Sequence, residues 1–123
     1  MSIIIRSQGF SVTEAIKAHL MRRFSAALRQ FDGSAMRLSV YLKDLNGGDK
    51  GGMDKCVLVN IQMPSLEPIT VETTSHDLYV AISLGARRTR RAVQRALRRH
   101  RHLERRIVRQ PQLSPPAAEA VPT

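Results

Sequence analysis

The sequence predicts a single α+β domain with the element order βαβββα. Three observations support this prediction: four short segments are β-branched or alternate in polarity, two segments repeat apolar residues every three or four positions, and turn residues separate them. The length of 123 residues suits one domain, and a hydrophobic content of 42% is sufficient for a core. Because aromatic residues make up only 4% of the chain, this core must be mostly aliphatic.

The first strand and the first helix are predicted in the N-terminal quarter of the chain. Residues 2–6 (SIIIR) are short and β-branched, and a Gln-Gly pair follows them. Ser11 and Glu14 have the spacing of a capping box, and Thr13 is an alternative N-cap. The apolar stripe of the helix consists of Val12, Ile16, Leu20, Phe24, Ala27, Leu28 and Phe31. An Asp-Gly pair ends the helix.

Three more strands follow in quick succession. Residues 36–43, 55–63 and 69–73 alternate between apolar and polar side chains, which predicts strands with one buried face. Residues 46–54 contain four of the seven glycines and predict a hairpin loop, with a spacing that matches no phosphate-binding loop. The short connections allow these three strands to run antiparallel.

A long helix follows the last strand. Thr74 and Asp77 have the spacing of an N-cap and its third helical residue, and Ser75 is an alternative cap. Apolar side chains then recur at helical spacing without an intervening proline. Gly85 is the one poor helix former, and it costs up to about 1 kcal/mol relative to alanine unless the helix packs closely on the sheet at this point.

The positive charge of the chain is concentrated in this long helix. The formal net charge is +10, to which residues 1–86 contribute +1, residues 87–109 contribute +10 and residues 110–123 contribute −1. Like charges three or four positions apart destabilise a helix, so a run of eleven arginines with one glutamate indicates an anionic partner. We expect the domain to cover residues 1–109, followed by a disordered Pro- and Ala-rich tail over residues 110–123.

The sequence argues against several classes of function. The apolar runs are too short for a bilayer and the N-terminus lacks a secretory signal, so we expect a cytoplasmic protein without a membrane partner. The four histidines form no metal-ligand pattern, Cys56 has no histidine near it in sequence, and no nucleophile elbow is present. We therefore expect no enzymatic activity, no catalytic or metal-binding residues, no cofactor and no small-molecule substrate.

RNA is the anion that the sequence favours. Arginine binds phosphate through a planar fork and stacks on bases. The apolar stripe of the long helix is rich in Ala and Thr and is needed by the sheet, which argues against a membrane surface. DNA is less favoured, since the chain contains no helix-turn-helix, zinc-finger or zipper pattern. Two alternatives stay open: a general module for structured RNA, and a protein-interaction module whose arginines bind an acidic partner.

The segments VTEAIKAHL (12–20) and HDLYVAI (76–82), together with the element order, resemble the ribosome hibernation-promoting factor family. This family includes ribosome-associated inhibitor A and was once described as modulators of sigma-54. The resemblance covers about residues 2–105 and is most specific in the Asp-Leu-Tyr-x-Ala-Ile run and the basic residues after it. It implies a four-stranded sheet with two helices on one face. It also implies a translation inhibitor of stress or stationary phase, which binds small-subunit ribosomal RNA and blocks the mRNA and tRNA sites.

The resemblance also implies a set of rRNA-binding residues. The family pattern Lys/Arg-x-x-Arg-x-x-x-Lys/Arg falls in the long helix, a basic residue recurs midway along the first helix, and a weaker match lies at the end of the second strand. The residues that match the family are Arg88, Arg91, Arg95, Arg23 and Lys43, and we add Arg87 to the expected set from the arginine run of the long helix. Arg87 and Arg90 occupy positions where the family usually has polar or acidic residues, and this surplus of arginines either extends the RNA contact or reflects composition.

Two further expectations follow from the resemblance. Tyr79 and Asp77 fit the family motif, and we expect them to serve the helix start and packing rather than RNA contact. The chain resembles the short members of the family, which lack a dimerisation domain, so we expect a monomer when it is not bound to the ribosome. Whether it promotes or prevents ribosome dimers stays open.

Overall fold

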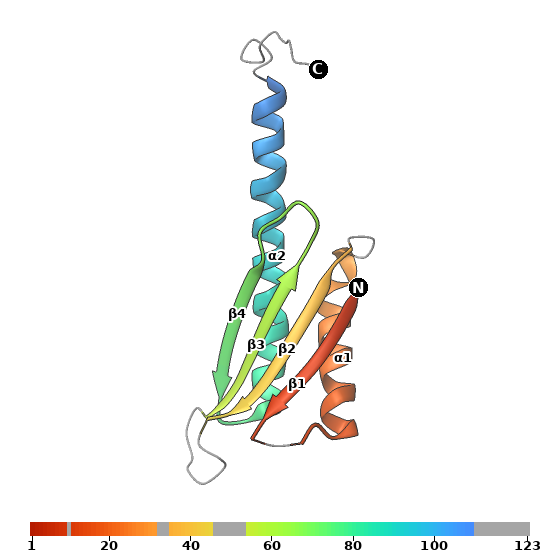
Figure 1. Cartoon of the computed structure of the whole chain (residues 1–123), viewed down its shortest axis with the longest axis vertical. Coiled ribbons are helices and arrows are strands. Elements are labelled where there is room, and N and C mark those ends of the chain that lie inside the picture. The colour runs from red at the N-terminus through yellow and green to blue at the C-terminus, as the bar shows by residue number, and fades with distance from the viewer. Residues whose placement is uncertain (10, 32–34, 46–53, 110–123) are drawn as a thin grey trace. The chain divides into compact units, whose positions relative to one another are not determined.

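Four strands and two helices follow one another in the order that the sequence predicts (Figure 1). The computed structural model describes residues 1–9, 11–31, 35–45 and 54–109, with side chains as far as residue 104. The strands are β1 (Ser2–Gln8), β2 (Arg37–Asp44), β3 (Lys55–Gln62) and β4 (Ile69–Ser75), and the helices are α1 (Glu14–Leu28), the 3-10 turn η1 (Arg29–Phe31) and α2 (Leu78–Arg109). Most of the predicted loop at 46–54 and the whole tail predicted at 110–123 lie outside the described residues.

The chain divides into two compact units, Met1–Val93 and Gln94–Thr123. The sheet, α1 and α2 up to Val93 belong to the first unit, whereas the second unit contains the rest of α2. Every contact between elements that is used below lies within the first unit.

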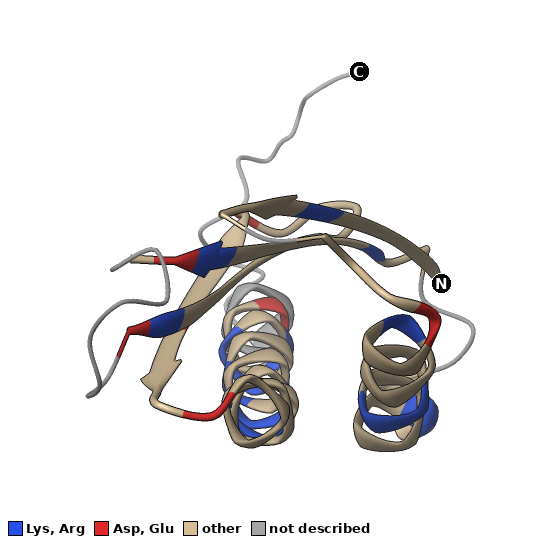
Figure 2. Ribbon diagram, turned by 90° about the horizontal axis from the view of Figure 1, so that it is seen from below, with Lys and Arg blue, Asp and Glu red and all other residues tan. Residues whose placement is uncertain are grey.

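The sheet is mixed, with the strand order β1-β2-β3-β4. β1 runs parallel to β2, with α1 as the crossover between them, and the pairs β2–β3 and β3–β4 are antiparallel, as the short connections predicted. Both helices lie against the same face of the sheet (Figure 2). The predicted α+β fold, with two helices on one face, is therefore confirmed.

The strand register aligns the apolar side chains into rows across the helix-covered face. One row contains Ile5, Val40, Val59 and Val71, and a second contains Ile3, Leu38, Ile61 and Ile69. Helix α1 adds the buried residues Ile16, Leu20, Phe24 and Leu28. The alternation and the helical stripe read from the sequence therefore meet in one largely aliphatic core.

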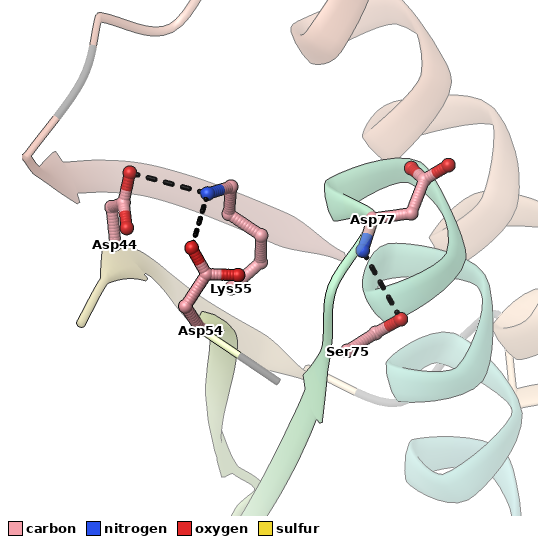
Figure 3. Close-up of polar contacts among 5 residues, drawn as sticks. All are labelled: Asp44, Asp54, Lys55, Ser75 and Asp77. Carbon is pink, nitrogen blue, oxygen red and sulfur yellow. Dashed lines mark hydrogen bonds and ion pairs between the residues drawn. The ribbon is translucent and has the colours of Figure 1, made fainter. Parts of the chain in front are cut away.

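Helix α1 begins at the alternative cap, Thr13, and not at the Ser11 capping box, and the start of α2 also differs from the first prediction. Thr13 is the N-cap of α1, and its side chain accepts a hydrogen bond from the backbone of the third helical residue at 3.2 Å. The Thr74 cap was wrong, because β4 continues through Ser75. Asp77 caps α2 instead, with Oδ1 accepting from the backbone N–H of Tyr79 at 2.9 Å. The Ser75 hydroxyl accepts from the Asp77 N–H at 3.3 Å and turns the chain from strand to helix (Figure 3).

Helix α2 packs closely on the sheet at Gly85. A Cβ atom at this position would lie 3.4 Å from Val57 Cγ1 and 3.7 Å from Thr73 Oγ1. These distances are ordinary van der Waals contacts, so α2 lies against the sheet at Gly85, but an alanine Cβ would also fit there.

An ion-pair cluster joins the adjacent ends of β2 and β3 (Figure 3). Lys55 Nζ donates to Asp54 Oδ2 at 2.8 Å and to Asp44 Oδ2 at 3.3 Å. The hydrogen bond from Lys55 holds the pKa of Asp54 below its ordinary value of 3.8, although burial acts in the opposite direction. The same bond raises the pKa of Lys55 above 10.5. Asp54 and Lys55 therefore both stay ionised across the physiological range of pH.

This cluster predicts a specific dependence of stability on acid. The unfolded chain protonates Asp54 near its ordinary pKa of 3.8, whereas the folded chain keeps the carboxylate ionised to a lower pH. The stabilisation is therefore complete above that pKa and is lost as the pH falls through the folded pKa. In urea titrations, Asp54→Asn should be less stable than the wild type at neutral pH, and the difference should shrink as the pH is lowered toward about 2. An exposed control, Glu67→Gln, should show no such convergence. A constant difference for Asp54→Asn would contradict the assignment.

Candidate nucleic-acid interface

The two helices run parallel to each other on the sheet. His19 Nε2 lies 3.2 Å from the Tyr79 carbonyl oxygen and 3.2 Å from the Ser83 hydroxyl. Further along, Arg90 Nη2 donates to Gln30 Oε1 at 3.3 Å. The partners His19 and Tyr79 are sixty positions apart in sequence, as are Gln30 and Arg90. The helices therefore keep a constant alignment along their shared length.

This alignment brings Arg23 and Arg87 to neighbouring positions. Arg23 follows His19 by four residues and Arg87 follows Ser83 by four, so each lies one turn further along the side of its helix that meets the other helix. Arg91 lies one turn beyond Arg87. All three side chains are exposed, and none makes a hydrogen bond or ion pair with another residue that the structure describes. We refer to Arg23, Arg87 and Arg91 as the helix-face arginines.

Two other arginines of α2 have partners within the domain. Arg88 is exposed, but its Nη1 donates to the backbone carbonyl of Glu72 at 3.2 Å, so its guanidinium reaches β4 at the edge of the sheet. Arg90, one of the surplus arginines, contacts Gln30 after the end of α1. The expected binding set therefore divides, because Arg88 reaches the edge of the sheet while Arg87 and Arg91 point to solvent.

The remaining expected arginine, Arg95, belongs to the second unit. It is exposed, and the other arginine side chains described in that unit are exposed as well: Arg98, Arg99 and Arg101. His100 and Glu104 form a pair at 3.4 Å between Nε2 and Oε2, one turn apart on the helix. This stretch of α2 thus presents mainly arginine to solvent.

Lys43 does not join the helix-face arginines. It lies on the face of the sheet opposite the helices, because the adjacent Leu42 is fully buried on the helix side. Its Nζ lies 5.1 Å from the centroid of the Tyr41 ring, a cation–π contact on the open face. The alternation of residues 36–43 already placed Lys43 opposite the buried face of this strand, whereas the family resemblance grouped it with the helix arginines.

The side chain of Cys56 is a buried free thiol. Its Sγ lies 3.5 Å from Glu72 Oε2, and only 2% of the residue is exposed. Burial, followed by the hydrogen bond to Glu72, raises the pKa of the thiol above 9.0, so it is a poor nucleophile at neutral pH. Within the described ranges, no group of three or more His, Cys, Asp or Glu side chains could hold a metal ion.

Tyr79 is an exposed aromatic residue at the start of α2. From the sequence we expected it to serve the helix start and packing. Tyr79 is 41% exposed, and its ring makes a T-shaped contact with His19, with centroids 4.9 Å apart and planes at 71°. The Asp-Leu-Tyr motif marks Tyr79 in the sequence. Its contact with His19 depends on how α1 and α2 are aligned, and helical periodicity within one segment does not give that alignment.

The comparisons with known proteins agree with this architecture. A search of curated proteins gave no match. The N-terminal domain of Thermus thermophilus Protein Y superposes with a TM-score of 0.64 at 22% identity, over 77% of this chain and 98% of that domain. A protein described as a ribosomal subunit interface protein from Coxiella burnetii gives a TM-score of 0.62 at 17% identity, over 76% of this chain and 96% of its own. These two structures share the fold.

The family comparison covers most of the chain. The model described as "Sigma 54 modulation protein / S30EA ribosomal protein" matches residues 3–101, which include the whole sheet, α1 and the larger part of α2. In the part of the chain that the structure describes, no helix is long and apolar enough to cross a membrane. The sequence resemblance and the fold point to the same group, and the chain belongs to the sigma-54 modulation protein / S30EA ribosomal protein family.

Proposed function

We propose that this protein is a ribosome-associated translation inhibitor of stress or stationary phase. It binds ribosomal RNA of the small subunit and occupies the space that mRNA and tRNA require. The observation that carries this proposal is the set of three helix-face arginines, which are exposed and have no partner among the described residues. Family membership and the printed description of the Coxiella burnetii protein support the ribosome as the partner.

The charge on the two helices suits a phosphate backbone. Glu14 is the only acidic residue in α1, and Glu104 is the only one in α2. Within the first unit, the positive charges of Arg23, Arg87 and Arg91 are therefore not balanced by acidic residues in the middle of either helix. Each guanidinium presents paired N–H donors that match phosphate oxygens. Arg88 belongs to the proposed contact within the first unit, and we propose that Arg95 of the second unit also binds RNA, whereas Lys43 lies on the other face of the sheet.

The proposed mechanism needs no turnover and no cofactor. Arginines that bind phosphates fix the position of the domain on the RNA and carry no sequence information themselves. Inhibition then follows from the volume of the rigid sheet and helices, which excludes other ligands from the occupied channel. Recognition by phosphate position and RNA shape suits structured ribosomal RNA, whose deep major groove is closed to side chains.

Sedimentation of the full chain with purified small subunits tests this function. We expect co-sedimentation whose affinity falls steeply with salt, with a slope of log affinity against log salt of about −0.9 for each phosphate neutralised on a duplex and about −0.7 on single strands. An in vitro translation reaction should be inhibited over the same range of protein concentration. A flat salt dependence would contradict the electrostatic contact.

Competition distinguishes this function from the two alternatives. Excess free duplex RNA should leave the chain bound to the small subunit, whereas a general module for structured RNA would be lost to the competitor. A protein-interaction module would instead recover an acidic protein from a nuclease-treated extract. Either of those outcomes would replace the proposed function.

A further inference from the structure

The exposed ring of Tyr79 lies on the first turn of α2, two turns before Arg87 on the same helix, and we propose that it is a stacking platform for an unpaired base of the bound RNA. The inference rests on the proposed function and specifies its ligand. This face of the domain takes a structured RNA that carries at least one unpaired nucleotide, rather than a continuous duplex.

The ring is held in place and yet open to solvent. The backbone N–H of Tyr79 is bound by the Asp77 cap at 2.9 Å, so the ring is attached to the fixed first turn of α2. The contact with His19 is T-shaped and therefore occupies at most one face of the Tyr79 ring. With 41% of the residue exposed, a large part of the ring is available to a ligand.

His19 fixes the ring from the neighbouring helix. Its Nε2 lies within hydrogen-bond distance of both the Tyr79 carbonyl and the Ser83 hydroxyl, at 3.2 Å each. These contacts orient the imidazole against the tyrosine and tie α1 to the first turns of α2. A platform that is ordered before binding loses little conformational entropy when a base stacks on it.

The surroundings of the ring match the two parts of a nucleotide. Val80, next to Tyr79, is also a large apolar residue that is 46% exposed, so the first turn of α2 presents an apolar surface to solvent. Arg23 lies one turn beyond His19, about 6 Å along α1, and Arg87 lies two turns beyond Tyr79 on α2. The face of a base can stack on the apolar surface of Tyr79 and Val80, and the phosphates on either side of that base can bind the arginines.

A paired duplex cannot use this arrangement, because its bases are stacked on one another. A bulged or looped nucleotide can be splayed out and stacked on an aromatic side chain. Stacking of this kind is worth about 1–3 kcal/mol for each base, which corresponds to an affinity change of about 5- to 150-fold. The ring should therefore determine which RNAs bind well, while the arginines support binding to all of them.

The two tyrosines and the absence of tryptophan allow a direct optical test. In Tyr41→Phe, Tyr79 is the only tyrosine, so the tyrosine emission reports on this ring alone, and a base stacked on it should quench that emission. We expect quenching by a short RNA hairpin with one bulged adenosine and none by the fully paired hairpin of the same sequence. Tyr79→Phe provides the matched control, because its remaining tyrosine lies on the opposite face of the sheet and should report only absorption by the RNA.

Affinities measured with the same two RNAs complete the test. Tyr79→Leu should bind the bulged hairpin about tenfold more weakly and the paired hairpin as well as the wild type does, while Tyr79→Phe should keep the preference. Thermal unfolding of each variant shows whether the fold is retained, and the quenching in Tyr41→Phe stands even if Tyr79→Leu is unstable. Absence of quenching, or equal losses on both RNAs, would overturn the stacking role. If the wild type binds neither RNA nor small subunits, the proposed function fails as well.

Discussion

Replacing Arg23, Arg87 and Arg91 together by glutamine should lower the affinity of the chain for small ribosomal subunits by about 10²–10³-fold at about 0.1 M salt. Three phosphates fewer would be neutralised, so the salt slope should become shallower by up to about 2.7. Because all three side chains are exposed, thermal unfolding should be nearly unchanged. Sedimentation at several salt concentrations measures both the affinity and the slope.

A matched variant tests whether the position of the three positive charges or the total net charge determines the affinity for the small subunit. Arg6, Arg37 and Lys43 all lie on the open face of the sheet, so their replacement by glutamine removes the same three charges from the opposite side of the domain. Because distant charges are screened at this ionic strength, this variant should lose less than about tenfold in affinity. Equal losses in the two triple variants would show that net charge, and not the helix face, governs binding.

Replacing Phe24 by alanine should destabilise the first unit by about 3–5 kcal/mol. Phe24 has 0% exposure, is the largest fully buried side chain described, and lies on the buried stripe of α1. Small domains have a total stability of about 5–15 kcal/mol, so this single change removes a large part of it. Urea denaturation followed by helical circular dichroism measures the loss.

The residue next to Phe24 supplies the contrast. Arg23→Ala lies on the exposed side of the same helix and should change stability by no more than about 0.5 kcal/mol, while it weakens binding to the small subunit. The two neighbouring substitutions should thus separate folding from binding. A loss below about 1 kcal/mol for Phe24→Ala would mean that α1 is held on the sheet by other contacts.

Periodicity was sufficient to predict the elements of this fold, because each strand has one buried face and each helix one buried stripe. It could not give the direction of β1, since a parallel and an antiparallel strand alternate in the same way. It also misplaced the cap of α2. Thr74, Ser75 and Asp77 all have side chains that cap helices, and the choice among them depends on how far β4 extends with its partner strand.

The candidate site could be predicted only in part, for a related reason. The exposure of Arg87 and Arg91 follows from their place off the apolar stripe of α2. The position of Lys43 on the open face likewise follows from the alternation of β2, whereas the contact of Tyr79 with His19 arises from packing between distant segments. Helical spacing describes one element at a time, so it cannot report which elements meet.

The hydrogen bond from Arg88 to the Glu72 carbonyl has a consequence for self-association. β4 is an outer strand, and the backbone groups on such an edge can pair with a strand from another molecule. The guanidinium of Arg88 donates a hydrogen bond to one of these carbonyl oxygens and places a positive charge beside the edge. A strand from another molecule would have to displace the guanidinium from the carbonyl, and the positive charge would then lie beside the new strand pair. Through this contact, α2 makes that part of the β4 edge less available for pairing with a strand of another molecule.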